Sequence, residues 1–315
     1  MNIIITVPED RSKTTNDNMA LLHKIEEDDC RHFATELDAL GYQTGFANWE
    51  DYDGQFHRVF VPGSREWRDT VDPAQTDLVF FYKMEEFLNN TQRFLQMVSA
   101  VGDQTVVINH PDTISHNMSK RYLLDLAERG IPTIPTFSLQ EALDQAESPT
   151  GYIVKPWIAE RGNHQYRAGS KQELAQLLEQ HPALAETHLA QPFDPSIQHG
   201  ERSLVYLGYD FEHAVIKTPQ EGEYQANGSQ GAKVVPYKPD RHELELAEAT
   251  LTAYPTPVFF SRIDIAGGRI MEAECLNPSI FANWVGRGEV YGKSFARHVD
   301  EFLQRGGFST EMSTT

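Results

Sequence analysis

Residues 257–279 read PVFFSRIDIAGGRIMEAECLNPS, and the rest of the chain is interpreted from this stretch. Apolar and β-branched residues run up to a glycine pair and resume after it, which predicts two strands joined at Ala266-Gly267-Gly268. Side chains alternate faces along a strand, so a three-residue loop puts the polar residues on one face and a two-residue loop sends the carboxylates to opposite faces. We therefore predict the three-residue loop and one shared face for Arg262, Asp264, Glu272 and Glu274.

The shared face predicts a metal site. Carboxylates within a few ångströms of one another repel strongly unless a cation lies among them. Asp264, Glu272 and Glu274 offer only hard oxygen ligands, which suit Mg²⁺ or Mn²⁺ better than zinc. The alternative is a solvated strand face whose charges never converge.

Composition limits the classes of function. The 315 residues are 40% hydrophobic and 23% charged, as in an ordinary globular protein of two or three domains. A formal charge of −19 disfavours nucleic acid and anionic membrane surfaces as partners, although a few local cations can still hold a nucleotide. No membrane-spanning run or signal peptide is recognisable, so we expect a cytoplasmic protein, with Cys30 and Cys275 as core thiols.

The first 110 or so residues read as an open parallel sheet, because apolar strand segments alternate with helical ones. A polar segment with several glycines and prolines, residues 51–76, is interpreted as loop or irregular structure. No G-x-G-x-x-G follows the first strand, so a dinucleotide fingerprint is absent. The strands are expected at 2–7, 42–47, 77–82 and 105–109, and the helices at 26–41 and 91–101.

The middle of the chain carries a candidate phosphate site. A helix is expected over 117–129, and S-x-x-E capping boxes at Ser138 and Ser170 announce two more. Lys155 ends an apolar strand beside a polar loop, where it can bind phosphate or be a surface lysine. A hairpin follows, then a long polar loop over 217–236 that we interpret as a lid or binding element. The tail after Gly306 is expected to be frayed.

From about Asn109 to Pro278 these elements resemble, in order and spacing, an ATP-grasp ligase of the glutathione synthetase type. The resemblance extends to the branch that contains the cyclo-ligase of cycloserine biosynthesis. It implies an α/β (α+β overall) ATP-grasp fold, with an N-terminal Rossmann-like parallel-sheet domain and two α+β subdomains sandwiching ATP. The implied bounds are 1–112 for the N-terminal substrate domain, 113–190 for the lid, 191–308 for the C-terminal subdomain with the metal site, and 309–315 for a tail.

The resemblance also implies roles for single residues. The segments SHNMSKRYLLDLAERGIPTIPT and YIVKP place Lys120 and Lys155 at the nucleotide phosphates. AQPF resembles the adenine hinge, and an acidic residue after it often binds the ribose. Gln225 stands where relatives often carry arginine. Implied for the adenine are Gln191, Pro192 and Phe193; for the ribose, Glu201; for substrate and phosphoryl contacts, Lys217, Asn227 and Arg262; for Mg²⁺ or Mn²⁺, Asp264, Glu272 and Glu274.

The implied activity is an ATP- and Mg²⁺-dependent carboxylate–amine ligase that forms an amide through an acylphosphate and releases ADP and phosphate. Its partners would be a small carboxylate, such as an amino acid or small peptide, and an amine. Relatives are often homodimers or homotetramers. Three alternatives stay open: an intramolecular cyclo-ligase, a non-catalytic nucleotide-binding protein, and an unrelated α/β binding module.

Overall fold

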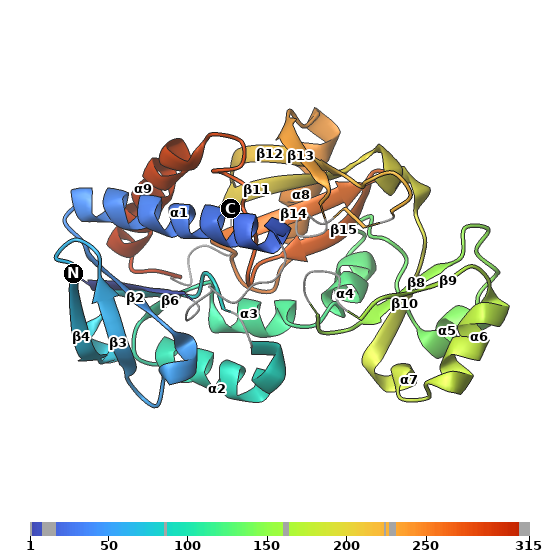
Figure 1. The fold of residues 1–315 in the computed structure, drawn as a ribbon, viewed down its shortest axis with the longest axis horizontal. Helices are drawn as coiled ribbons and strands as arrows, with labels where there is room; N and C mark the ends of the chain where they lie inside the picture. Colours follow the sequence, from blue (N-terminus) through green and yellow to red (C-terminus); the bar gives the residue numbers. More distant parts are fainter. Residues whose placement is uncertain are drawn as a thin grey trace.

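The computed structural model describes residues 2–7, 17–84, 87–159, 164–223, 225–226 and 231–308. These residues form a six-stranded, a four-stranded and a five-stranded sheet. The six-stranded sheet lies at one end of the molecule, the four-stranded sheet at the other, and the five-stranded sheet between them (Figure 1). Of the tail after Gly306 that was expected to be frayed, residues 309–315 lie outside the described residues. No helix in the described ranges is long and apolar enough to cross a membrane.

The N-terminal sheet has the strand order β4-β3-β2-β1-β5-β6. Four neighbouring strands, β2, β1, β5 and β6, run parallel to one another, which confirms the predicted parallel sheet. Ile3 and Ile5 face one layer of helices and Ile4 the other, so both faces are buried. The bounds are β1 Asn2–Thr6, β2 Gln43–Ala47, β3 Phe56–Val61, β4 Glu66–Val71, β5 Leu78–Phe80 and β6 Val106–Ile108.

The interpretation of 51–76 as loop was wrong, because β3 and β4 form an antiparallel hairpin there. Two features conceal it in the sequence. Phe56, Val59 and Val61 are the buried residues of β3, so a break in alternation at Arg58, which has a φ of 51°, hides the period of two. The second strand, β4, is mostly exposed and polar, as edge strands often are.

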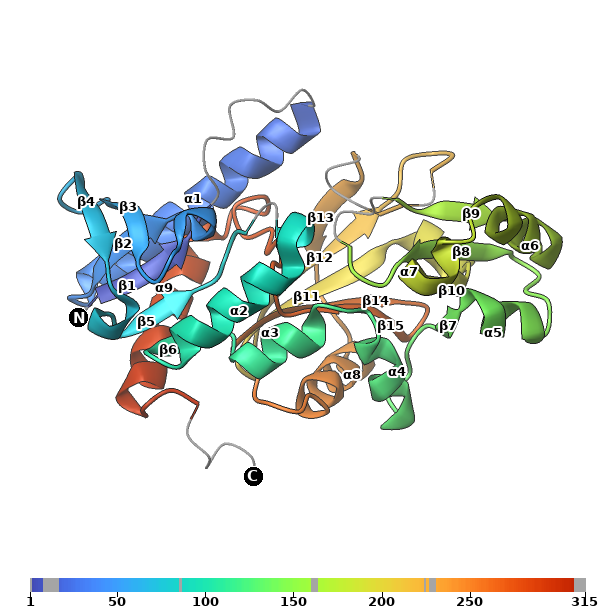
Figure 2. The ribbon, with the colours of Figure 1, turned by 90° about the horizontal axis from the view of Figure 1, so that it is seen from below.

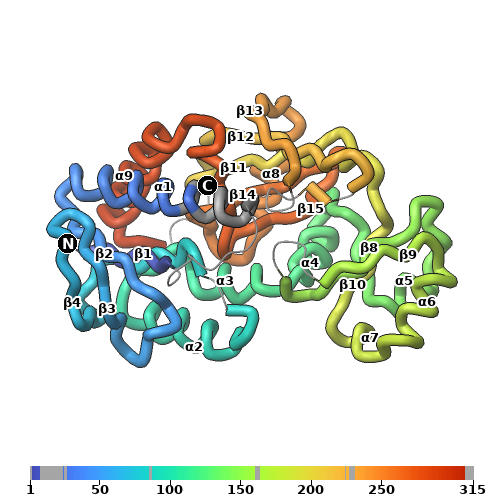
Figure 3. The backbone as a smooth tube through the Cα atoms, in the orientation of Figure 1, coloured from blue at the N-terminus to red at the C-terminus, as the bar shows by residue number. Residues whose placement is uncertain are grey.

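Helices cover both faces of this sheet. On one face α1 lies beside α9, so the C-terminal helix, which the sequence analysis did not predict, returns to the N-terminal domain (Figures 1 and 3). On the other face α2 and α3 lie side by side (Figure 2). Both cysteines are buried in apolar clusters, as expected. The bounds are α1 Asp17–Ala39, α2 Thr91–Gly102, α3 Pro111–Asn117 and α9 Gly288–Gln304.

The four-stranded sheet, order β7-β10-β8-β9, carries α5, α6 and α7 and is called the lid below. Ser138 makes the complete capping box predicted for α5. At α6 the box is half formed, because Ser170 caps the helix but Glu173 accepts from Gly169 N at 2.7 Å instead. The bounds are β7 Phe137–Ser138, β8 Tyr152–Pro156, β9 Tyr166–Ala168, β10 His188–Pro192, α5 Leu139–Asp144, α6 Lys171–Gln180 and α7 Leu184–Thr187.

The five-stranded sheet has the order β13-β12-β11-β14-β15, with α4 and α8 packed on one face. The predicted helix over 117–129 was wrong in extent, since α3 ends at Asn117 and α4 begins only at Tyr122. Part of the predicted loop over 217–236 is strand β13. The bounds are β11 Glu201–Leu207, β12 Asp210–Thr218, β13 Lys233–Tyr237, β14 Phe260–Ala266, β15 Arg269–Glu274, α4 Tyr122–Glu128 and α8 Arg241–Thr252.

Candidate active site

The hairpin of β14 and β15 presents the predicted polar face, but with a different turn and a bulge. Its turn has two residues, Gly267 and Gly268, with φ of 57° and 71°, because Ala266 pairs with Arg269. The predicted three-residue loop was therefore wrong. A bulge restores the register, since Ile265 pairs with Ile270 and Asp264 with Glu272, leaving Met271 as the extra residue. The shared face of Arg262, Asp264, Glu272 and Glu274 is confirmed.

Asp264 is the most heavily bonded carboxylate of this face. It is buried and accepts hydrogen bonds from Arg262 Nε at 2.9 Å and Nη2 at 2.8 Å, from Lys217 Nζ at 3.2 Å and from Ser203 Oγ at 2.6 Å. Burial alone would raise the pKa of Asp264, but the charges of Arg262 and Lys217 outweigh it and hold that pKa well below its usual range. Asp264 is therefore a fixed negative charge.

Arg262 links two of the carboxylates. Its Nη2 lies 2.6 Å from Glu274 Oε2 as well as 2.8 Å from Asp264 Oδ2. Burial raises the pKa of Glu274 to about 7; Arg262 opposes this shift, and Glu272 and Asp264 add to it. At Glu274, burial and the neighbouring carboxylates thus outweigh the charge of the arginine.

Lys217 joins Glu201 to the same cluster. The two residues pair across β11 and β12, and Lys217 Nζ forms an ion pair with Glu201. Burial lowers the pKa of Lys217, but Asp264 and Glu201 outweigh it and the net shift is upward. Below both cations lies the ring of Phe281, 5.8 Å from the Arg262 guanidinium and 5.9 Å from Lys217 Nζ. Phe281 has a φ of 57°, a strained conformation for a bulky residue, and no sequence motif predicted its position.

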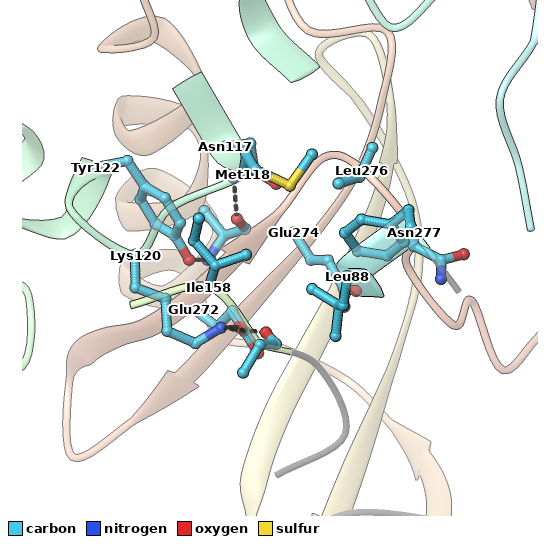
Figure 4. A pocket seen from close by; sticks show the side chains of 13 residues that line it. Leu88, Asn117, Met118, Lys120, Tyr122, Ile158, Glu272, Glu274, Leu276 and Asn277 are labelled. Carbon is cyan, nitrogen blue, oxygen red and sulfur yellow. Dashed lines mark hydrogen bonds and ion pairs between the residues drawn. The ribbon is translucent and has the colours of Figure 1, made fainter. Parts of the chain in front are cut away.

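Two further lysines lie near the hairpin, Lys120 from the connection between α3 and α4 and Lys155 from β8 of the lid. Lys120 Nζ lies 2.9 Å from Glu272 Oε1 and donates to Ala159 O at 2.8 Å (Figure 4). Burial and then the charge of Lys120 lower the pKa of Lys155 to about 8. Burial would raise the pKa of Glu272, but Lys120 and Lys155 lower it overall. Both predicted phosphate lysines therefore act electrostatically on the predicted metal-binding face.

The predicted adenine hinge is bonded within the lid rather than to this charge cluster. Gln191 is buried and donates from Nε2 to Thr136 Oγ1 at 2.9 Å. The backbone N–H of Phe193 donates to Gly151 O at 3.0 Å, and its carbonyl accepts from Thr150 Oγ1 at 2.6 Å. Pro192 pairs with Tyr152 across β10 and β8.

The two predicted covering loops lie only partly within the described residues. Asn227 lies outside them, as do 160–163 in the loop after Lys155. Gln225 Nε2 donates to Gln165 Oε1 at 3.1 Å, so the two loops touch each other. Gln225 thus contacts the neighbouring loop.

The donor set fits a hard divalent cation. Within the described ranges no three His, Cys, Asp or Glu side chains converge as a metal cluster, because lysine and arginine side chains lie among the carboxylates instead. Asp264, Glu272 and Glu274 nevertheless supply only carboxylate oxygens from one strand face. Burial, with the charges of Glu272 and Asp264, raises the pKa of Glu274 to about 7, and a divalent cation at this face would favour its ionised form.

A pocket adjoins this face and has walls of two kinds. Lys120, Glu272 and Glu274 form its ionic side, and apolar side chains face them (Figure 4). The apolar side chains are Phe87, Leu88, Met118, Ile158 and Leu276. Phe87 and Leu88 belong to the short helix that follows β5, so the N-terminal domain contributes a wall to the pocket.

Lys83 is a further charged residue near this site that the sequence analysis missed. It is buried just beyond the carboxyl end of β5 and donates to Pro278 O at 3.3 Å. Its charge opposes, as a smaller effect, the rise in the pKa of Glu274. A signal was present, since ligands bind outside the carboxyl ends of parallel strands and a lysine there directly follows an apolar segment.

Comparison with known proteins identifies the family of the chain. The family model "Prokaryotic glutathione synthetase, ATP-grasp domain" matches residues 119–284, more than half of the 315 residues. The cycloserine biosynthesis protein DcsG of Streptomyces lavendulae is 23% identical, over 68% of this chain and 81% of its own length. The glutathione synthetase of Neisseria meningitidis is 22% identical, over 89% of this chain and 91% of its own length.

Solved structures confirm the predicted ATP-grasp fold. The crystal structure of D-cycloserine synthetase DcsG superimposes with a TM-score of 0.73 at 20% identity, covering 96% of this chain and 100% of that one. The D-alanine–D-alanine ligase of Bacillus anthracis superimposes with a TM-score of 0.63 at 11% identity, covering 97% and 98%. The chain is therefore an enzyme that belongs to the prokaryotic glutathione synthetase family of ATP-grasp ligases.

Proposed function

We propose that the enzyme joins a carboxylate to an amine in an ATP- and Mg²⁺-dependent reaction that passes through an acylphosphate. One observation carries the proposal: a single cluster, buried at Asp264 and partly exposed at Glu272 and Glu274, holds these three carboxylates among cationic side chains. The cations are Lys120, Lys155, Lys217 and Arg262. Such a mixture suits a polyphosphate with its divalent metal, which brings both signs of charge.

The proposed residue roles follow from this placement. Asp264, Glu272 and Glu274 would hold Mg²⁺ or Mn²⁺, which when bound supplies neutralisation of the phosphate oxygens. Lys120 and Lys155 would bind the nucleotide phosphates. Those two residues approach from the loop after α3 and from the lid, so they meet a nucleotide held between lid and hairpin. For the adenine and ribose we keep Gln191, Pro192, Phe193 and Glu201, and for substrate contacts Asn227.

The chemistry needs no nucleophilic side chain. A substrate carboxylate oxygen attacks the γ-phosphorus of ATP, and the bond to the bridging oxygen of ADP breaks. Arg262 and Lys217 would stabilise the charge on the phosphoryl group during transfer. An amine then attacks the acyl carbon, the bond to phosphate breaks, and the amine proton passes to solvent. The touching loops of Gln165 and Gln225 would exclude water from the acylphosphate.

We also propose the division into an N-terminal substrate domain over 1–112, a lid subdomain over 113–190 that contains the lid sheet and also α4, and a C-terminal subdomain over 191–308. The three sheets support it, because the strands of each sheet lie within one of these ranges, except that β10 of the four-stranded sheet extends two residues past residue 190. Helix α9 lies in the last range but packs on the first, so the N-terminal and C-terminal units share a core.

Intramolecular cyclisation is a second candidate. The chain matches DcsG over 96% of its length with a TM-score of 0.73, and that protein is a D-cycloserine synthetase. The two candidates share the acylphosphate and differ only in where the amine comes from. A cyclo-ligase releases ADP with one substrate, whereas an intermolecular ligase needs two.

The first test is thermal unfolding with and without Mg-ATP, for the wild type and Glu272→Gln. Ligand bound only to the folded state stabilises it, by about 2.7 kcal/mol at a concentration about 100 times Kd. We expect a rise in Tm that requires both Mg²⁺ and ATP and that Glu272→Gln loses. The matched control is Glu66→Gln on the exposed edge strand β4, which should keep the whole rise.

The outcome decides between the proposals. No rise at millimolar Mg-ATP, or an equal rise in Glu272→Gln, contradicts nucleotide binding at the hairpin. Where the rise is present, ADP release is measured with single amino acids and then with pairs. Release that requires a pair supports the intermolecular ligase, and release with one substrate supports cyclisation.

A further inference from the structure

The strand that carries Glu272 and Glu274 lies at the edge of its sheet, and its outer backbone is bonded by side chains. Ala273 N donates to Tyr122 Oη at 3.1 Å, and Cys275 N donates to Asn117 Oδ1 at 2.8 Å. Asn117 Nδ2 donates in turn to Ala273 O at 2.6 Å. An amide and a phenol therefore replace a neighbouring strand at the positions that alternate with the two glutamates.

The same short segment also carries Lys120. Helix α3 ends at Asn117 and α4 begins at Tyr122, so the lysine lies in a non-helical connection between the two side chains that bind β15. Figure 4 shows Asn117 and Tyr122 against the strand and Lys120 reaching Glu272. The strand is thus bound by this segment through neutral hydrogen bonds at 273 and 275 and through an ion pair at 272.

Both side chains are firmly held. Tyr122 is 2% exposed and Asn117 is 8% exposed. Asn117 Nδ2 also donates to Tyr254 Oη at 2.9 Å, which further fixes the amide. The connection is bound on its other side to the lid, because Lys120 N donates to Trp157 O at 2.8 Å and Lys120 Nζ to Ala159 O. It therefore joins the lid to the hairpin.

We infer that Asn117 and Tyr122 are positioning residues for nucleotide binding. Their bonds to Ala273 and Cys275 hold the connection on the edge of β15, and so set the place of Lys120 relative to the carboxylate of Glu272. Without these bonds the connection keeps its hydrogen bonds to Trp157 and Ala159 and the packing of α4, but it loses its direct hydrogen bonds to β15, so Lys120 is held less firmly relative to the carboxylates. The inference rests on the proposed function, since the property that it concerns is the binding of Mg-ATP.

The test uses Tyr122→Phe, which removes only the hydroxyl that accepts from Ala273 N. Its control is Tyr206→Phe in the same apolar cluster, because the buried Tyr206 hydroxyl has no hydrogen-bond partner among the described residues. The dissociation constant of Mg-ATP is measured by titration calorimetry on the full chain. We expect Tyr122→Phe to weaken binding about fivefold, as the loss of one buried hydrogen bond of about 1 kcal/mol gives. Tyr206→Phe should bind as the wild type does.

A double-mutant cycle separates positioning from general stability. In a Lys120→Met background there is no lysine to position, so Tyr122→Phe should weaken Mg-ATP binding no further. An equal loss in both backgrounds overturns the inference, as does unchanged affinity of Tyr122→Phe with a lowered Tm. Should Tyr122→Phe not fold, Tyr254→Phe removes an acceptor of Asn117 and takes its place in the cycle. Absence of Mg-ATP binding by the wild type instead overturns the proposed function.

Discussion

His213 shows how burial, as the largest influence, sets the protonation of one residue. It lies on β12 with 5% of its surface exposed, and its Nε2 donates to Ile280 O at 2.7 Å. Its other ring nitrogen, Nδ1, is buried without a hydrogen-bond partner among the described residues. Burial lowers the pKa of His213 to about 4; the hydrogen bond to Ile280 opposes this shift and the charge of Arg287 adds to it. The folded protein therefore holds a neutral imidazole.

We predict that His213 makes the protein sensitive to acid. The unfolded chain binds this proton near pH 6.5 and the folded protein only near pH 4. The stabilisation from the neutral ring is therefore fully present above pH 6.5 and is lost as the pH falls towards 4. The loss amounts to about 3 kcal/mol over the window. It is measured as the free energy of unfolding in urea at pH 7 and pH 5, in the wild type and in His213→Gln.

The His213→Gln variant should show a smaller decline between these pH values by about 2 kcal/mol. Exposed His199 provides the control, because His199→Gln should decline as steeply as the wild type. A decline of the same size in His213→Gln would mean that this ring does not cause the acid sensitivity.

The packing of α1 against α9 depends on a close approach of two helices. Gly288 and Gly292 on α9 both face His32 of α1. A Cβ built on Gly292 would lie 2.9 Å from His32 Cβ and 3.2 Å from its backbone carbonyl. Part of the obstruction is backbone, which cannot rotate away. Glycine is therefore required here despite its low helix propensity.

We predict that Gly292→Ala destabilises the protein by about 1–3 kcal/mol, because an overpacked contact must push the helices apart. Helix propensity alone predicts a gain of about 1 kcal/mol, so the two effects differ in sign. Urea unfolding measures the difference. Lys293→Ala, one residue further on the exposed side, should stay within about 0.5 kcal/mol of the wild type. A more stable Gly292→Ala would show that the helices are free to adjust.

The connection between the N-terminal sheet and the hairpin passes through one amide. Asn109 follows β6 and is 3% exposed. Its Nδ2 donates to Phe260 O at 2.7 Å and Cys275 O at 2.6 Å, and its Oδ1 accepts from Phe259 N at 2.8 Å and Phe260 N at 2.9 Å. The carboxyl edge of the parallel sheet is thereby bonded to both strands that carry the candidate active site.

We predict that Asn109→Ala lowers the free energy of unfolding by about 3 kcal/mol or more. The substitution leaves several buried backbone groups without partners, and each costs about 1–3 kcal/mol. Asn90→Ala is the control, because Asn90 only caps α2 and its loss should cost about 1 kcal/mol. Chemical denaturation compares the two. Equal losses would mean that the hairpin does not depend on this connection.

The sequence alone was sufficient for features that rest on local periodicity and on motif order. Apolar segments alternating with helices predicted the parallel strands, and the charged alternation in RID and EAE predicted one shared face. The motifs around Lys120, Lys155 and Asp264 led to the correct family. Each strand pattern or motif spans only a few residues, so the backbone period and the order of the motifs along the chain are enough to recognise them.

Features that depend on contacts between distant segments needed the folded chain. The two-residue turn reaches the predicted face only through the bulge at Met271, and β3 and β4 escape detection because a polar edge strand has no apolar period. Tyr122 and Asn109 bond backbone groups about 150 residues away in the sequence. Hydrogen bonds and steric fit act over a few ångströms in space, and a linear sequence does not specify which remote atoms lie within that distance.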